Sequence, residues 1–297
     1  MLDHGGRLRD AARRYGIPLA QWLDLSTGIN PWPWPVPTLS PACWQRLPEE
    51  DDGLEQAAAA YYGNPRVLPV AGSQAAIQVL PRLFPPAVVA CIAPLYDEHP
   101  QAWSRAGHRV RRLQQATLPR ALAAATPIIL LCNPNNPTGQ RHDGDQLLAA
   151  AAQLARRGGW LVVDEAFADC DPAASVVGLA GSAEAPNLVV LRSLGKFFGL
   201  AGARIGFVCA APDLLQRLQE LLGPWTVSGP AREAARQALA DRDWQAAAFR
   251  RLEEAGAHLA ALLRPLGPVQ ATPLFATLTT PDSQALHAFL AQRGILT

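Results

Sequence analysis

Lys196 is the only lysine in the chain, because 25 of the 26 Lys+Arg residues are arginine. An arginine stays protonated at any workable pH, whereas a lysine amine can lose its proton and attack a carbonyl carbon. The lysine stands in "SLGKFFGLAGARIGF", residues 193–207. Its retention there points to covalent chemistry, with chance retention in an arginine-rich composition as the alternative.

Other reactive or polar side chains follow apolar runs, where the ligands of parallel α/β sheets bind. The run at 67–70 is followed by Ser73 and Gln74, which open a helix whose free N–H groups suit a phosphate. Serine is also an ordinary helix cap. The next apolar run is followed by Tyr96, an aromatic ring that more often only packs. His99 fits either a place beside Tyr96 at a ligand or a structural role.

Three later runs end in polar groups as well. The turn "NPNNPTG" (133–139) offers the Asn136 amide to a ligand. Asp164 ends a buried run, and a buried acid is costly unless it is paired, so we expect a cationic partner nearby. Ser193 and Arg204 flank the lysine and could hold a phosphate, the arginine as a two-pronged donor.

Together these residues are an amine nucleophile, a buried carboxylate, an aromatic ring and several phosphate donors. That set is what a protein needs to hold pyridoxal 5'-phosphate. Lys196 would bind the cofactor covalently, and Asp164 would keep the pyridine nitrogen protonated so that the ring withdraws electrons. The sequence therefore predicts a pyridoxal-phosphate enzyme with Lys196 and Asp164 as its catalytic residues.

The elements that must position these groups are predicted by apolar runs. Runs that are apolar on both faces are typical of strands in a mainly parallel sheet covered by helices on both sides. They lie at 87–94, 126–134, 159–167, 187–193 and 204–210. Helical stretches at 54–63 and 144–158 alternate with them, so the fold class is α/β.

Three domains are expected. Residues 1–40 are rich in X-Pro steps, which disfavour helix, and should form an extended arm outside the core. Residues 41–225 should form the large cofactor-binding domain. Residues 226–297 should form a small carboxyl-terminal α/β domain with a helical region, one strand-like stretch (269–280) and a last helix; we expect it to be truncated at its end.

Composition excludes several classes of partner. With 49% hydrophobic and 17% charged residues the chain is globular, and a net charge of +1 gives no field for nucleic acid or an anionic membrane. The five cysteines are odd in number and form no CxxC pair, and the histidines show no metal spacing, so neither a disulfide framework nor a metal site is expected. No signal peptide and no apolar stretch of membrane-spanning length is visible, so we expect a soluble cytoplasmic protein.

Taken jointly, the motifs at 133–139, 162–167 and 193–207 resemble the class I/II, histidinol-phosphate-type aminotransferases of fold type I, over nearly the whole chain. Residues 4–17 and 24–35 are similar to the arm of the L-threonine-O-3-phosphate decarboxylases of cobalamin biosynthesis. The resemblance implies a homodimeric enzyme that decarboxylates L-threonine O-3-phosphate to (R)-1-amino-2-propanol O-2-phosphate.

The resemblance also implies a role for each site residue. Lys196 corresponds to the lysine that binds the cofactor, Asp164 to the partner of its pyridine nitrogen, and Asn136 to the residue that bonds its phenolic oxygen. Tyr96 corresponds to the ring stacked on the cofactor. The remaining positions are the phosphate cup, Ser73, Gln74, Ser193 and Arg204, and two arm residues that approach the substrate, His4 and Asn30.

Three positions depart from the common transaminase pattern. Phe167 replaces a tyrosine and removes a hydroxyl near the cofactor oxygen, so Asn136 must act there alone; phenylalanine is typical of the decarboxylases. Leu47-Pro48 replaces a Tyr-Pro pair whose ring reaches the phosphate site of the partner subunit. The family's arginine for the substrate carboxylate lies in a final strand beyond Thr297, and no residue here matches it.

The core motifs serve more than one reaction. Whether the Cα–H bond or the carboxylate is broken depends on the groups that grip the substrate, and the arm and Phe167 favour decarboxylation. The first alternative is an aminotransferase for a phosphorylated amino substrate such as histidinol phosphate. The second is a non-catalytic binding module with the same fold. A nicotinamide dehydrogenase is disfavoured, because no GxGxxG follows an early strand.

Overall fold

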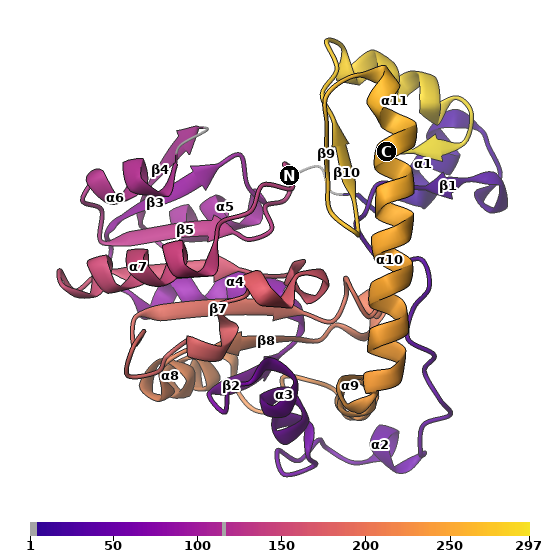
Figure 1. The fold of residues 1–297 in the computed structure, drawn as a ribbon. Coiled ribbons are helices and arrows are strands. Elements are labelled where there is room, and N and C mark those ends of the chain that lie inside the picture. Colours follow the sequence, from indigo (N-terminus) through magenta and orange to yellow (C-terminus); the bar gives the residue numbers. More distant parts are fainter. Residues whose placement is uncertain (1–4, 115–116) are drawn as a thin grey trace.

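The computed structural model describes residues 5–114 and 117–297. Figure 1 shows a large α/β body and a smaller unit, which the long helix α10 (Arg242–Leu263) joins. The smaller unit contains α1 (Leu8–Tyr15), β1 (Leu23–Asp24), β9 (Val269–Ala271), β10 (Ala276–Leu278), α11 (Ser283–Ala291) and β11 (Ile295–Leu296). Among the described residues, no helix has the length and apolar character needed to cross a membrane.

The large body is built on one seven-stranded sheet in the order β2-β8-β7-β6-β5-β3-β4. Among the described strands of this sheet, β8 runs antiparallel to both of its neighbours, β2 and β7, and the other adjacent pairs are parallel. The predicted mainly parallel α/β fold is therefore confirmed. The strands are β2 (Val67–Val70), β3 (Val88–Ala93), β4 (Arg109–Gln114), β5 (Ile128–Cys132), β6 (Trp160–Asp164), β7 (Leu188–Ser193) and β8 (Gly206–Cys209).

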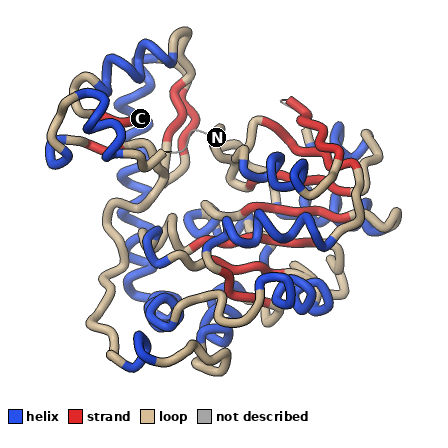
Figure 2. Tube along the Cα trace, turned by 180° about the vertical axis from the view of Figure 1, so that it is seen from behind, coloured by secondary structure: helices blue, strands red, loops and turns tan. Residues whose placement is uncertain are grey.

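Helices cover both faces of this sheet, which Figure 2 shows from behind. Along β6, Leu161 and Val163 pack into the core on one face and Val162 into the core on the other. This two-sided burial is why the strands are apolar throughout. The first face carries α3 (Leu54–Tyr62), α6 (Leu118–Ala123), α7 (Gly144–Ala155) and α9 (Gly229–Ala240); the second carries α4 (Gly72–Val79), α5 (Glu98–Arg105) and α8 (Pro212–Leu222).

The arm is more structured than the sequence predicts. It was expected to be extended and outside the core, but it forms α1 and β1, and Trp34 is 5% exposed within the main core. The short helix α2 (Ala42–Gln45) follows the arm. α1 ends at Gly16, whose φ of 68° stops the helix. The X-Pro steps keep the chain around Trp34 extended, and an extended segment can still bury one large ring.

The carboxyl-terminal region also differs in detail. The predicted helical region is two helices that break at Asp241, whose side chain accepts from the Trp244 N–H and caps α10. The predicted single strand at 269–280 is a hairpin of β9 and β10. Pro273 lies in its turn and cannot donate to a strand ladder, which explains the interruption.

A buried cluster of charges lies on the face of β7 opposite Ser193. Arg192 is 3% exposed and donates to the Glu165 carboxylate at 2.8 Å and to the Asp169 carboxylate at 2.5 Å. Tyr61 donates its hydroxyl to the same Asp169 oxygen at 3.0 Å. Burial raises the pKa of the Glu165 carboxyl, and the charge of Arg192 opposes that rise. This arginine therefore compensates two buried acids at the end of β7, just before the loop that carries Lys196.

We predict that Arg192→Met destabilises the protein by about 3–5 kcal/mol in urea unfolding, because it leaves two buried carboxylates without their cationic partner. The loss should shrink as the pH falls, since a carboxyl whose folded-state pKa is raised is relieved by protonation. Arg105→Met, at an exposed arginine, is the control and should change stability by less than about 0.5 kcal/mol. A loss independent of pH would contradict this role of Arg192.

Candidate active site

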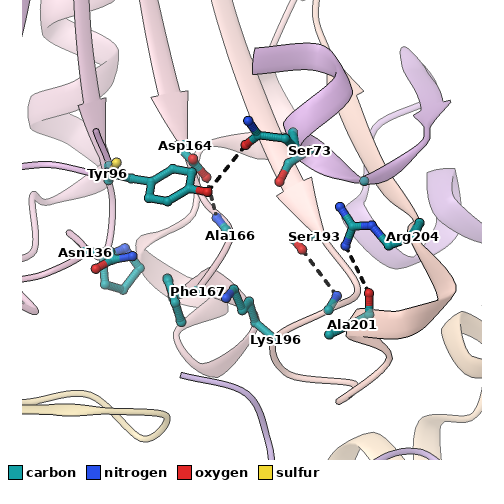
Figure 3. A pocket seen from close by; sticks show the side chains of 15 residues that line it. Ser73, Tyr96, Asn136, Asp164, Ala166, Phe167, Ser193, Lys196, Ala201 and Arg204 are labelled. Atoms are coloured by element: carbon teal, nitrogen blue, oxygen red, sulfur yellow. Dashed lines mark hydrogen bonds between the residues drawn. The ribbon is translucent and has the colours of Figure 1, made fainter. Parts of the chain in front are cut away.

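A cavity of about 170 Å³ opens at the carboxyl ends of β5, β6 and β7. Its wall includes every cofactor-site residue predicted from the sequence: Ser73, Gln74, Tyr96, Asn136, Asp164, Ser193, Lys196 and Arg204. Figure 3 shows their side chains converging from different elements. The parallel strands bring together positions that are far apart in sequence, as expected at this edge of the sheet.

Asp164 is held at the floor of the cavity. It is 5% exposed; its Oδ2 contacts His99 Nε2 at 2.7 Å, and its Oδ1 accepts from the Ala166 N–H at 3.0 Å. His99 is 1% exposed and meets the Tyr96 ring edge-on, so it lies behind the carboxylate. His99 is thus a hydrogen-bonding partner of this buried acid, and a carboxylate fixed in this way can bond a protonated ring nitrogen in the cavity.

Lys196 reaches the same cavity from the loop after β7. Its Nζ lies 5.1 Å from the centre of the Phe167 ring. Burial lowers the pKa of the Lys196 amine, and the charge of Arg204 acts in the same direction, whereas Asp164 raises it. The net effect is a lowered pKa, which increases the fraction of neutral amine available as a nucleophile at neutral pH.

Phe167 links this wall to the rest of the chain. Its ring packs edge-on against Phe275 of the smaller unit, with ring centres 4.9 Å apart. Gly28 of the arm lies against it, so that a Cβ at this position would stand 2.8 Å from the Phe167 ring. The two rings and the glycine make an apolar wall where a tyrosine would have offered a hydroxyl.

The opposite end of the cavity suits a phosphate. Ser73 lies in the first turn of α4, where free N–H groups and the helix dipole attract an anion. Gly72 has φ of 71°, and a Cβ there would lie 2.6 Å from the Arg204 guanidinium, which therefore packs directly over the helix start. Arg204 donates to the Ala201 carbonyl at 3.0 Å and remains exposed, and Ser193 accepts from Gly195 N–H at 3.2 Å.

Tyr96 and Asn136 border the remaining sides. The Tyr96 hydroxyl donates to Gln74 Oε1 at 3.5 Å, and burial, followed by the charges of Glu98 and Asp164, raises the pKa of this phenol. In the turn before Asn136, the Asn135 amide donates to the Pro94 carbonyl at 2.9 Å. The bracing of its neighbour leaves the Asn136 side chain directed at the cavity (Figure 3).

Two arm residues, Asn30 and His4, were predicted to approach the substrate, and the structure describes only Asn30. Asn30 is 3% exposed, and its side chain donates to the Phe197 carbonyl at 2.8 Å. It therefore lies against the loop that carries Lys196 and is absent from the cavity wall. His4 lies outside the described residues.

Two side chains that lie beside Asp164, those of His99 and Cys132, were not predicted as part of the site. His99 was left open between two roles, and Cys132 carried no expectation of a ligand contact. The sulfur of Cys132 lies within 4.8 Å of ligand atoms of both His99 and Asp164. One signal was available in the sequence, because Cys132 ends an apolar run just as Asp164 does.

The residues present fit pyridoxal phosphate. The cavity has an amine of lowered pKa, a fixed carboxylate on its floor, an aromatic side chain at its border and a helix start with an arginine at its far end. This is the donor set predicted from the sequence, gathered around one space.

Comparison with known proteins agrees with this arrangement. The family model described as aminotransferase class I and II matches residues 47–291. The chain belongs to this family. Among curated relatives, it is 55% identical to a threonine-phosphate decarboxylase of Pseudomonas aeruginosa, over 100% of this chain and 89% of that protein. It is 43% identical to a protein of the same name from a Sinorhizobium species, over 99% and 88%.

Solved structures of the aminotransferase type share the fold. Histidinol-phosphate aminotransferase from Sinorhizobium meliloti, in complex with pyridoxal-5'-phosphate, superposes with a TM-score of 0.83 at 21% identity, over 99% of this chain and 86% of that one. L-threonine-O-3-phosphate decarboxylase from Porphyromonas gingivalis gives a TM-score of 0.71 at 22% identity, over 86% and 81%. The aminotransferase class I and II fold is thus confirmed.

We predict that Arg204→Gln weakens binding of pyridoxal phosphate by about 10- to 100-fold, because a charged hydrogen-bond donor to the phosphate is lost. Binding of pyridoxal, which has no phosphate, should change by less than about threefold. Both affinities can be measured by quenching of protein fluorescence. An equal loss for the two ligands would show that Arg204 does not act on the phosphate.

Proposed function

We propose that this chain is a pyridoxal-phosphate-dependent decarboxylase that converts L-threonine O-3-phosphate to (R)-1-amino-2-propanol O-2-phosphate, a step of cobalamin biosynthesis. The observation that carries the proposal is the 55% identity to a threonine-phosphate decarboxylase over the whole chain, arm included. Histidinol-phosphate aminotransferases match at 32–34% over 57–77% of the chain. We place the reaction in the cytoplasm, the compartment that the cysteine pattern of the sequence predicts.

When bound, pyridoxal phosphate supplies an electron sink for the pair of electrons released as carbon dioxide leaves. Asp164 would support this chemistry from the floor of the cavity by holding a proton at the pyridine nitrogen. The His99 contact at 2.7 Å keeps the Asp164 carboxylate in place, which matters because a side chain with a locked orientation loses no reorganisation energy during reaction.

Lys196 is the proposed nucleophile and proton carrier. The lowered pKa of its amine favours the neutral form, with which Lys196 would hold the cofactor covalently. The same Nζ, when protonated, would donate a proton to the substrate carbon that has lost its carboxylate. Ser73 and Arg204 would hold the cofactor's phosphate and so keep that carbon within reach of Nζ.

Phe167 would shape the choice of bond. It offers no hydroxyl to the cofactor, so Asn136 is left as the side chain proposed to bond the phenolic oxygen. The apolar face of Phe167 lies beside the Lys196 Nζ, where it would limit the access of water to the reacting side. A carboxylate held against such a wall is poorly solvated, which favours its loss as neutral carbon dioxide.

The test is product analysis with L-threonine O-3-phosphate and the cofactor-loaded protein. We expect carbon dioxide in equal amount to aminopropanol phosphate, without any need for 2-oxoglutarate. Glutamate and an oxo acid formed from 2-oxoglutarate would assign the chain to the aminotransferase alternative. Cofactor binding without turnover of either kind would support the non-catalytic module.

We also propose that the chain is a homodimer, in line with the resemblance noted in its sequence. Apolar side chains of the arm and its continuation are unusually exposed, which is typical of a surface covered by another chain. They are Leu19, Leu23, Leu25, Trp32, Val36, Trp44 and Leu47, each at least 40% exposed.

Sedimentation at micromolar concentration should therefore give a dimer. Trp44→Glu, at a side chain 70% exposed, should weaken the dimer, because a charge would enter the covered surface. Leu266→Glu, at a residue 68% exposed outside the arm, is the control and should leave the dimer intact. A monomer for the unaltered chain would contradict the proposal.

A further inference from the structure

The arm holds the backbone of the lysine loop, residues 194–199. Three consecutive carbonyls of this loop accept hydrogen bonds from it. The Asn30 N–H donates to the Lys196 carbonyl at 3.0 Å, the Asn30 side chain to the Phe197 carbonyl at 2.8 Å, and the Trp34 N–H to the Phe198 carbonyl at 2.9 Å. The segment that carries the reactive amine is thus fixed by residues more than 160 positions earlier in the chain.

Both ends of the Asn30 amide are used within the protein. Its Nδ2 donates to the Phe197 carbonyl, and its Oδ1 accepts from the Trp32 N–H at 2.9 Å. The residue is 3% exposed, and a buried amide that lost either partner would leave an uncompensated polar group. The geometry therefore fits a brace between arm and loop better than a contact to a substrate.

Gly199 gives a second, independent sign of close contact. Its φ is 68°, and a Cβ at this position would stand 2.7 Å from the Pro33 Cα and 3.0 Å from the Asn30 carbonyl oxygen. No side chain fits between the two segments. The arm and the lysine loop are packed backbone against backbone at this point.

The brace continues into helix α10. The Trp34 indole N–H donates to Asp241 at 3.0 Å, and Asp241 caps α10 by accepting from the Trp244 N–H at 3.0 Å. The Trp244 ring in turn packs on Phe197 and Phe198, with ring centres 5.5 and 5.6 Å away. The lysine loop is therefore enclosed between the arm and the start of the helix that joins the two parts of the molecule.

We propose that Asn30 is a positioning residue that sets where the Lys196 amine stands in the cavity, by fixing the Lys196 and Phe197 carbonyls. The inference rests on the proposed function only in that Lys196 binds the cofactor, and it does not depend on the substrate. A displacement of about 1 Å at a reacting group can cost about 100-fold in rate. Asn30 acts through the loop and touches no reacting atom.

The test compares variants at two buried asparagines. Asn30→Asp keeps the shape of the side chain and places an oxygen against the Phe197 carbonyl in place of the donor. Asn30→Ser removes the amide donor and shortens the side chain without adding a charge. The matched control is Asn187→Asp: Asn187 is 7% exposed and donates to the carbonyls of Ala151 and Gly159 at the far end of β7.

The first measurement uses cofactor-loaded protein without substrate. Visible absorbance is titrated against pH, because its midpoint reports the proton on the nitrogen that links Lys196 to the cofactor. We expect the Asn30 variants to shift this midpoint by about half a pH unit or more, and Asn187→Asp to keep the midpoint of the unaltered protein. This readout stands whether or not the protein decarboxylates L-threonine O-3-phosphate.

The second measurement separates rate from binding. We expect kcat to fall about 10- to 100-fold in both Asn30 variants while KM changes less than about threefold. A raised KM with an unshifted midpoint would overturn the proposal and assign Asn30 to the substrate. An unshifted midpoint with unchanged kinetics would overturn it as well. If Asn30→Asp fails to fold, Asn30→Ser decides between these outcomes.

Discussion

The need to compensate one buried carboxylate organises the active site. Asp164 ends the central strand β6 at a position 5% exposed to solvent, where an isolated charge would be very costly. His99 and the Ala166 N–H meet part of its hydrogen-bonding capacity. Asp164 also lines the cavity, where a cationic N–H donor would compensate its charge. A protonated pyridine ring is such a donor, and the lysine, the aromatic ring and the phosphate end of the cavity are arranged around its expected place.

The last two residues of strand β7 point to opposite faces of the sheet and support the site from both. Ser193 faces the cavity, and Arg192 points to the opposite face, where it joins Glu165 and Asp169. The lysine loop begins directly after this pair, so its start is anchored by a buried ion network below and its carbonyls are held by the arm. A rigid support of this kind suits a residue that must stay within bonding distance of a cofactor while substrates bind and products leave.

Much of the fold could be predicted from the sequence because the buried strands are apolar on both faces. Runs such as 159–167 and 187–193 have no other stable place than the middle of a covered sheet. The edge strand β4 could not be predicted in this way, since half of its residues are arginines and most of them are exposed. Most of the cavity residues could be predicted because they end or follow a parallel strand, and the parallel order brings strand ends together.

Long-range side-chain contacts could not be predicted. Neither the contact of His99 with Asp164 nor that of Asn30 with the Phe197 carbonyl has a local sequence signal, because each joins segments whose approach only the packed fold determines. The most direct measurement of the account's central claim is the ¹⁵N chemical shift of the pyridine nitrogen in protein loaded with labelled pyridoxal phosphate. The account predicts a protonated nitrogen at neutral pH that becomes unprotonated in Asp164→Asn. An unprotonated nitrogen in the unaltered protein, or a shift that Asp164→Asn leaves unchanged, would contradict it.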